Sequence, residues 1–498
     1  MTLGLTGITR QGLYEDEAAG CRAALWLRHG VTQPGADPPW MAASYAASVT
    51  GVLYGAWLRV SGREFEVASW RLCGLVLVAS GLASWPLLTA SSLGLGAQAA
   101  FLALFVTDSA ALLFARNMNA MSFSLLLGFG IAAFWLHGIN SRRAAGGLGL
   151  LVGFCVFDKL TNLALLPVCA ALLAPPRSRR HWGWAAGGFL LGVSPLLATN
   201  LYALARSGRA TSLAPILSNY PAYSLAGFLG RAASLGSGAL PAEFILGMAI
   251  TPARVLAAAA EGGLLLILLS YIGLDATRKR RLTPAAALAT AYALVLTVLF
   301  CLPRPTWAHH WLIATPLQYA ALAAALGVVR PRRWLVTGIT LLLLIRIPGL
   351  WDIESALARG QSAARWHPSL TKYARFAADH RDALFLSATW GVQNAAACLS
   401  QEDGHVVSLQ PLRIGRAELE RLIAARRPRM LYVAAKGFAT GSSRGDPAPV
   451  LALCKSLPQW RPTPLEPEAR RWPAVSLWKF EPRPPGSRVS RQSLENGL

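Results

Sequence analysis

Charged residues are scarce in this chain. They make up 14% of its 498 residues, whereas soluble domains carry about 25%. Hydrophobic residues make up 54%, and the mean hydropathy is +0.41. The charges that are present gather in short clusters and in the last third of the chain. This distribution is typical of a helical membrane protein that carries a soluble tail.

Several signatures of other protein classes are also absent. The sequence has no Cys-x-x-Cys or Cys/His spacing typical of zinc sites, no glycine-rich phosphate loop and no internal repeat. The net charge is +23, but no Arg/Lys-rich recognition helix stands out. We therefore assign the basic residues to cytoplasmic loops and anionic headgroups rather than to nucleic acid. Among seven cysteines, Cys398 and Cys454 lie in polar segments, which leaves a disulfide between them open.

Apolar runs of about 20 residues, the length that crosses a bilayer, recur along the chain. They are residues 67–89, 94–114, 118–138, 182–204, 253–274, 284–302, 309–329 and 334–350. A further apolar stretch, 144–174, is interrupted by Asp158 and Lys159, so we expect two short helices that meet at this pair. Together these segments predict about ten crossings. We place the apolar segment 38–60 partly in the membrane interface.

Four clusters of basic residues give the predicted orientation. They are Arg142–Arg143, Arg177–Arg180, Arg278–Arg281 and Arg330–Arg333. Two crossings separate each cluster from the next, so all four lie on one side, which the positive-inside rule identifies as the cytoplasm. Residues 1–66, the Asp158–Lys159 tip and everything after residue 351 then lie outside. We therefore predict a multi-pass protein of the plasma (inner) membrane whose outer face is periplasmic or extracellular. Because residues 1–13 contain neither a signal peptide nor a spanning segment, we expect a membrane helix upstream of them.

The predicted organisation has four parts. Residues 1–66 carry an acidic motif and interfacial helices, and residues 67–350 form the polytopic membrane domain. Residues 355–481 alternate strands with helices, which predicts a small α/β domain on the outer face. Its expected strands are 383–388, 405–409, 429–434 and 474–480, and its expected helices are 390–400, 415–426 and 447–457. Residues 482–498, rich in Pro, Ser and Arg, form a disordered tail. The predicted fold class is mainly α.

Three consecutive carboxylates, Glu15, Asp16 and Glu17, lie at the start of a predicted amphipathic helix, 17–29. Acidic residues at a helix N-terminus complement the helix dipole, which is one interpretation. The other is catalytic, because a hydroxyl group is a poor nucleophile until a general base takes its proton.

Charges at the tip of the apolar hairpin are costly, and such charges are usually functional. Lys159 is a candidate cation for a lipid phosphate. The alternative is an Asp158–Lys159 pair that reaches the membrane surface. Arg116 lies in a predicted turn, 108–119, where its planar fork suits a phosphate or anchors the helix at the interface.

Arg304, His309 and His310 precede a late helix, where they could meet an anion or a sugar hydroxyl. Adjacent histidines on a helix face different ways, which argues against a metal bound by this pair. The segment 37–40, Asp-Pro-Pro-Trp, reads as a turn. Under the predicted orientation all of these candidates fall on the outer face.

The order of these motifs resembles that of the GT-C fold transferases. An acidic pair precedes an interfacial helix, followed by a Pro38-Pro39 turn and by GREFEVASWRL at 62–72. The stretch GFCVFDKLT at 153–161 is similar to their lysine-bearing hairpin, and HHWLIATP at 309–316 resembles the opening of a late helix. The resemblance covers residues 13–350 and includes protein O-mannosyltransferases and bacterial lipid A aminoarabinose transferases. Trp390-Gly391 is similar to the outer domain of some members.

This resemblance implies an inverting transfer of a sugar from polyprenyl phosphate to a hydroxyl acceptor on a lipid, glycan or protein. Asp16 and Glu17 match the catalytic Asp-Glu pair, with Asp16 as the base, and Lys159 matches the phosphate-binding lysine. Arg116 or Arg304 and the His309 region would assist. Many relatives need no metal, although Glu15 and Glu17 leave a divalent metal open. This chain departs from the family in lacking its first helix and in placing Asp158 before the lysine.

A transporter or flippase for a lipid-linked or anionic substrate is the alternative from another class. Transporters bury charges near the bilayer midplane and often show a repeated half. Here the candidate charges lie at one face and no repeat is present, which favours a transferase. A scaffold protein, the third interpretation, would not require Asp16 or Lys159.

Overall fold

The computed structural model describes most of the chain. The described residues are 5–30, 40–43, 46–117, 121–175, 179–207, 224–225, 227–228, 232, 236–302, 308–362, 366–389, 391–401, 404–409, 415–437, 446–465 and 472–484. The chain divides into two compact units. The membrane unit comprises Met1–Arg10, Gly20–Arg28 and Ala36–Ser362, and the α/β unit comprises Gln11–Ala19, His29–Gly35 and Ala363–Leu498.

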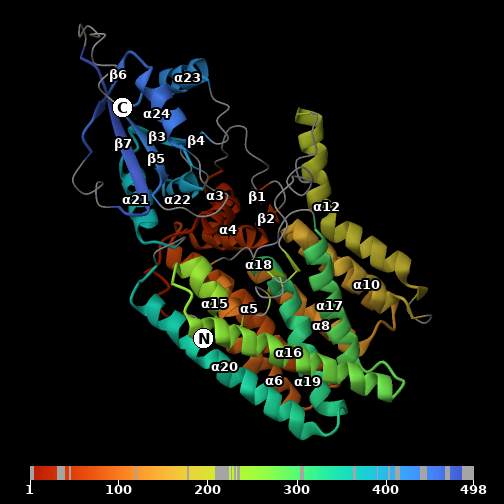
Figure 1. The fold of residues 1–498 in the computed structure, drawn as a ribbon. Helices are drawn as coiled ribbons and strands as arrows, with labels where there is room; N and C mark the ends of the chain where they lie inside the picture. The colour runs from red at the N-terminus through yellow and green to blue at the C-terminus, as the bar shows by residue number, and fades with distance from the viewer. Residues whose placement is uncertain are drawn as a thin grey trace. The chain divides into compact units, whose positions relative to one another are not determined.

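Helices make up most of the membrane unit (Figure 1). Its long helices are α5 (Val67–Thr89), α12 (Trp182–Ser207), α16 (Pro252–Arg278), α17 (Pro284–Cys301) and α20 (Arg332–Ala358). These five are long and apolar enough to cross a membrane, and α6 (Leu95–Val106) with α7 (Ser109–Asn117) forms a sixth candidate, bent by 63°. The protein is therefore a multi-pass membrane protein, as the sequence predicts.

The other predicted crossings are shorter among the described residues than the sequence indicates. They are α8 (Ser122–His137), α9 (Arg142–Asp158), η2 (Leu160–Leu165) with α10 (Leu166–Leu173), and α18 (Ala308–Trp311) with η4 (Leu312–Ala314) and α19 (Thr315–Val328). Two of the breaks coincide with polar residues, since Thr107 and Asp108 follow the end of α6 and Lys159 follows the end of α9. The predicted meeting of two short helices at Lys159 is confirmed.

Local sequence explains where two of the long helices begin. The hydroxyl groups of Thr251 and Thr283 accept hydrogen bonds from the backbone of Arg254 and Ala286, respectively. Each threonine is followed by a proline in the first turn, where no backbone N–H is needed. A Thr-Pro pair thus starts both α16 and α17.

Glycines allow α9 and α12 to pack closely. A Cβ atom on Gly149 would overlap the carbonyl of Ala185, and a Cβ atom on Gly188 would overlap the carbonyl of Gly146. Small residues are typical of helix contacts in membranes, where close backbone approach replaces the hydrophobic effect. This packing holds the helix that ends at Lys159 against a long membrane helix.

A short hairpin covers the break that follows α9. Strands β1 (Met41–Ala43) and β2 (Ala46–Ala47) pair in antiparallel fashion and lead into α4 (Val49–Ser61), which Ser48 caps at Gly51 N, 3.1 Å away. Met41 and Ala47 pack with Val156, Phe157 and Leu160 in one apolar cluster. The start of α4 therefore lies beside the Lys159 break within the same unit.

The α/β unit contains a mixed five-stranded sheet of order β4-β3-β5-β7-β6 (Figure 1). The strands are β3 (Ala383–Ser387), β4 (Val406–Ser408), β5 (Met430–Lys436), β6 (Trp460–Thr463) and β7 (Val475–Pro482), and the helices are α21 (Ser369–Asp379), α22 (Val392–Leu399), α23 (Arg416–Arg426) and α24 (Ala448–Lys455). β4, β3 and β5 are parallel, whereas β7 is antiparallel to its neighbours β5 and β6. All four predicted strands and all three predicted helices are present. β6 and α21 are additional.

Side chains alternate across this sheet, as the two-residue period of a strand requires. Leu384 and Leu431 pack with Leu419 of α23 and Val450 of α24. At the next position of each strand, on the opposite face, the rings of Phe385 and Tyr432 stack with their centres 4.8 Å apart. Both rings contact aromatic residues of α21. The sheet therefore has an apolar layer on each face.

The Cys398–Cys454 disulfide that the sequence leaves open does not form. Cys454 is a free thiol buried in the core of the α/β unit, between α24 and the sheet. Cys398 is disulfide-bonded, and so is Cys21. Helix α24 directs Cys454 into the apolar layer, where cysteine behaves as a small hydrophobic residue.

Candidate active site

Lys159 lies at the break between two helices of the membrane unit. Helix α9 ends at Asp158, Lys159 has extended backbone angles (φ −153°, ψ 122°), and η2 starts at Leu160. Lys159 is 6% exposed and Asp158 is 1% exposed. An amine and a carboxylate are costly to bury in apolar surroundings, and such groups usually mark functional positions.

A polar network holds the break in place. The Asp158 carboxylate accepts a hydrogen bond of 2.6 Å from the Ser124 hydroxyl group, which in turn accepts one of 2.9 Å from the Asn162 amide. The Asn162 amide also donates to the carbonyl oxygen of Cys155, over 2.8 Å. Through Ser124, Asp158 joins the turn that carries Lys159 to α8.

Arg116 forms an ion pair in the membrane unit. Its guanidinium donates to both carboxylate oxygens of Glu354, at 3.1 and 3.4 Å, and to the carbonyl oxygen of Thr6 at 3.0 Å. Both partners are buried, with side chains 0% and 8% exposed. This two-pronged contact joins α7 to α20, and the predicted contact of Arg116 with a phosphate stays a prediction.

A second set of charged groups includes Asp108, eight residues before Arg116, and Arg346, eight residues before Glu354. Asp108 precedes α7, where one of its oxygens accepts a hydrogen bond of 2.9 Å from Ala111 N. Its other oxygen accepts one of 2.6 Å from the Tyr319 hydroxyl group. On α20, Arg346 pairs with Glu261 of α16 at 2.6 Å and donates to the carbonyl oxygen of Leu104 at 3.0 Å. The Arg346 guanidinium also lies 5.1 Å from the centre of the Tyr319 ring.

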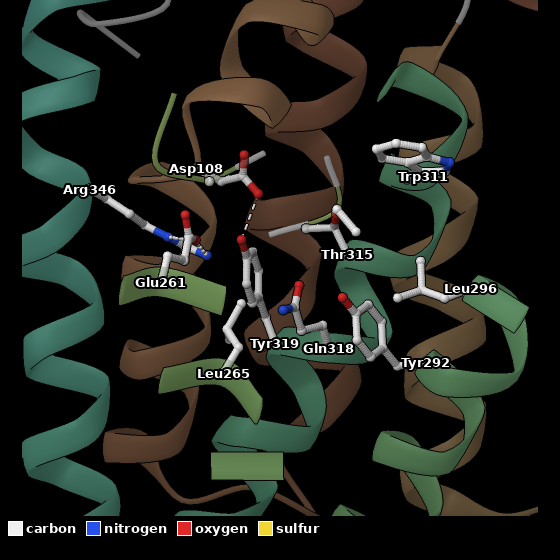
Figure 2. Close-up of a pocket in the computed structure, with 12 residues that line it drawn as sticks. Asp108, Glu261, Leu265, Tyr292, Leu296, Trp311, Thr315, Gln318, Tyr319 and Arg346 are labelled. Carbon is white, nitrogen blue, oxygen red and sulfur yellow. Dashed lines mark hydrogen bonds and ion pairs between the residues drawn. The ribbon is translucent and has the colours of Figure 1, made fainter. Parts of the chain in front are cut away.

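These groups line a narrow pocket, which Figure 2 shows. Its lining is Asp108, Ala232, Gly236, Glu261, Leu265, Tyr292, Leu296, Trp311, Thr315, Gln318, Tyr319 and Arg346. Acidic, hydroxyl and amide groups therefore face one another inside the membrane unit.

The predicted acidic motif is held by the α/β unit. The Glu17 carboxylate accepts hydrogen bonds from Tyr14 N and from the Trp366 indole, both over 3.2 Å. The rings of Tyr14 and Trp366 lie 4.5 Å apart. The Glu17 carboxylate therefore holds the first turn of helix α2 (Glu15–Gly20) in place. The side chains of Glu15 and Asp16 lie outside the described residues.

The late-helix candidates are described only in part. Arg304, the side chain of His309 and residues 37–39 lie outside the described residues. His310 is 7% exposed on α18, next to Trp311, which lines the pocket. Among the described residues no group of three or more His, Cys, Asp or Glu side chains is arranged to hold a metal ion.

Sequence reasoning missed the buried charges of the pocket. Glu261 and Arg346 each stand inside an apolar run that we predict to cross the membrane. That position was a usable signal, because ionisable residues within membrane segments are rare and pair with one another. Glu354 follows such a run rather than standing inside it, so its position is a weaker indication of a buried charge.

The chain's fold is similar to that of known glycosyltransferases. ArnT from Cupriavidus metallidurans bound to undecaprenyl phosphate superposes with a TM-score of 0.60 at 13% sequence identity, covering 96% of each chain. ArnT in the apo state gives 0.60 at 12% identity with the same coverage. The arabinofuranosyltransferase AftD from Mycobacteria gives 0.51 at 13% identity, over 96% of this chain and 39% of the other. The sequence matches no protein-family profile and no curated protein. The protein therefore has the GT-C fold, which confirms the predicted resemblance at the level of the fold.

Proposed function

We propose that this protein is a membrane glycosyltransferase that moves a sugar from a polyprenyl phosphate to a hydroxyl acceptor at the outer face of the plasma membrane. The observation that carries the proposal is Lys159, a buried lysine at a helix break that a polar network holds in place. It occurs in a fold shared along 96% of the chain with ArnT, whose structure binds undecaprenyl phosphate.

The proposed reaction is a single displacement. The acceptor oxygen attacks the anomeric carbon as the bond from that carbon to the phosphate oxygen breaks, which inverts the configuration. Asp16 takes the acceptor's proton, and Lys159 stabilises the charge that grows on the departing phosphate. The role of Asp16 rests on its match to the family's acidic pair, and the role of Lys159 rests in addition on its burial at the break.

Two features support the outer face. The four basic clusters place the Lys159 break opposite the cytoplasm by the positive-inside rule. Cys21 and Cys398 are disulfide-bonded, and disulfides persist in oxidising compartments such as the bacterial periplasm. Both features agree with a donor whose prenyl chain lies in the lipid and whose sugar projects outward.

The alternative function, transport, is favoured by the Arg346–Glu261 pair, which is buried inside the membrane unit. Transporters bury charges in this way. Proteoliposomes that contain the purified protein separate the two functions. A transporter moves the lipid-linked sugar between leaflets with the glycosidic bond intact, whereas the transferase releases polyprenyl phosphate.

The test of the proposed function is release of polyprenyl phosphate from a panel of polyprenyl-phosphate sugars by the full-length protein in nanodiscs. We expect Asp16→Asn to lower the turnover number about 10²–10⁴-fold, the usual contribution of a general base. Glu64→Gln, which alters an exposed acid paired with Arg28, is the control and keeps full turnover. Normal turnover in Asp16→Asn would identify a different base.

A further inference from the structure

The pocket between α16, α17, α19 and α20 contains an acidic oxygen that no described residue satisfies. One carboxylate oxygen of Glu261 is bound by Arg346, at 2.7 Å from Nε. The other, Oε2, has no hydrogen-bond partner among the described residues, although Glu261 is 1% exposed. A buried acceptor without a donor is destabilising, so its position calls for a ligand or a water that supplies the donor.

The backbone of Gly236 lies against the Glu261–Arg346 pair. A Cβ atom on Gly236 would overlap the Glu261 carboxylate and lie 2.6 Å from the Arg346 guanidinium, so the glycine leaves room for this pair. The Ser109 hydroxyl group holds that backbone by donating to the Gly236 carbonyl oxygen over 3.1 Å. The Glu261 carboxylate is therefore oriented by its ion pair with Arg346.

The charges of the pocket select the kind of ligand. Two carboxylates, Asp108 and Glu261, face a single guanidinium, that of Arg346. A phosphate or a carboxylate would meet net negative charge, and a metal cation would be repelled by the guanidinium that already occupies one oxygen of Glu261. A neutral group that donates a hydrogen bond meets neither objection.

The remaining lining suits a hydroxyl group. Tyr292 and Gln318 contribute a hydroxyl and an amide to the same pocket, and Figure 2 shows both directed toward its interior. Such groups both donate and accept, as a sugar hydroxyl does. The pocket is too narrow for a sugar ring, so it takes a single substituent.

The pocket also adjoins the element that follows Lys159. Helix α17, which contributes Tyr292 and Leu296, packs against η2, the helix that begins directly after the lysine. The pocket and the Lys159 break therefore share α17 as a neighbouring helix.

We propose that this pocket is a subsite for a neutral sugar and that Glu261 is a specificity-determining residue, whose Oε2 accepts a hydrogen bond from a sugar hydroxyl group. The identification of the sugar as that of the donor rests on the proposed function. Arg346 and Gly236 are positioning residues for this contact. Donors whose sugar carries a carboxylate at the same place are rejected.

The direct test is saturation-transfer NMR with neutral methyl glycosides and the matching methyl glycosiduronic acids, on the full-length protein in nanodiscs. We expect a neutral glycoside to bind, its uronic acid to bind at least about tenfold more weakly, and Glu261→Gln to weaken the neutral glycoside by at least about tenfold. Tyr292→Phe leaves the Arg346–Glu261 pair intact and weakens binding about fivefold. Tyr271→Phe, at a partly exposed tyrosine that donates to the Arg330 carbonyl oxygen, binds as the unaltered protein does.

The outcomes distinguish this subsite from the proposed function. Failure of every neutral glycoside to bind, or unchanged binding in both Glu261→Gln and Tyr292→Phe, overturns the subsite even if sugar transfer is observed. Binding that both variants weaken, without polyprenyl phosphate release from any donor, supports the subsite and contradicts the transferase.

Discussion

Replacing Glu354 by alanine removes the carboxylate that pairs with Arg116. The guanidinium is fully buried and the carboxylate is 8% exposed, so water cannot replace the lost partner without rearrangement of α7 and α20. Breaking a buried ion pair on one side costs about 3–5 kcal/mol. We expect Glu354→Ala to lower the free energy of unfolding by about that amount.

The same helix supplies a matched control. Asp352, two residues earlier on α20, pairs with Arg254 at 3.1 Å, but its side chain is 50% exposed. An exposed pair contributes about 0–1 kcal/mol, so Asp352→Ala is expected to be nearly neutral. Replacing both buried partners, in Arg116→Met/Glu354→Leu, removes the uncompensated charge and should recover much of the stability.

The assay is denaturant unfolding of the full-length protein in lipid micelles, followed by tryptophan fluorescence. Equal destabilisation by Glu354→Ala and Asp352→Ala would refute the reasoning. So would a double variant that is less stable than Glu354→Ala. Either result would mean that the stability of the α7–α20 contact does not depend on the pairing of Arg116 with Glu354.

Two further predictions concern packing and pH. Gly149→Leu should disrupt the α9–α12 contact and lower the midpoint of thermal unfolding. The control is Gly187→Leu on α12, where a Cβ atom meets no atom within 4 Å, and it should be tolerated. Equal effects of the two variants on thermal unfolding would contradict the packing. Burial lowers the pKa of His367 in the α/β unit. As the pH falls through the unfolded-state value of about 6.5, the unfolded state takes up a proton that the folded state resists, so stability falls. His367→Gln should therefore flatten the pH dependence of unfolding between pH 7.5 and 5.5, and an unchanged slope would rule out this histidine as the cause.

Local patterns predicted what depends on neighbours in sequence. The strands of the α/β unit follow from short apolar runs between turns, and the Lys159 break follows from two charges in an apolar stretch. β6 escaped prediction because Pro462 interrupts its pattern. The strand lies at the end of the sheet, where proline is tolerated.

Contacts between distant segments could not be predicted in the same way. The Glu17–Trp366 hydrogen bond joins residues 349 positions apart, and the Arg346–Glu261 bond joins residues 85 positions apart. A single sequence indicates that a buried charge needs a partner, but the partner depends on which helices are neighbours. For the same reason, the acidic motif was expected with the interfacial helices, although residues 11–19 cluster with the α/β unit.

The central claim is that Lys159 stabilises the departing phosphate of a polyprenyl-phosphate sugar. The most direct test compares the turnover number for polyprenyl phosphate release in Lys159→Ala with that in Lys279→Ala, whose lysine lies exposed at the end of α16. We predict a loss of about 10²–10³-fold in Lys159→Ala and none in Lys279→Ala. Turnover in a folded Lys159→Ala protein that equals that of the unaltered protein would contradict the account.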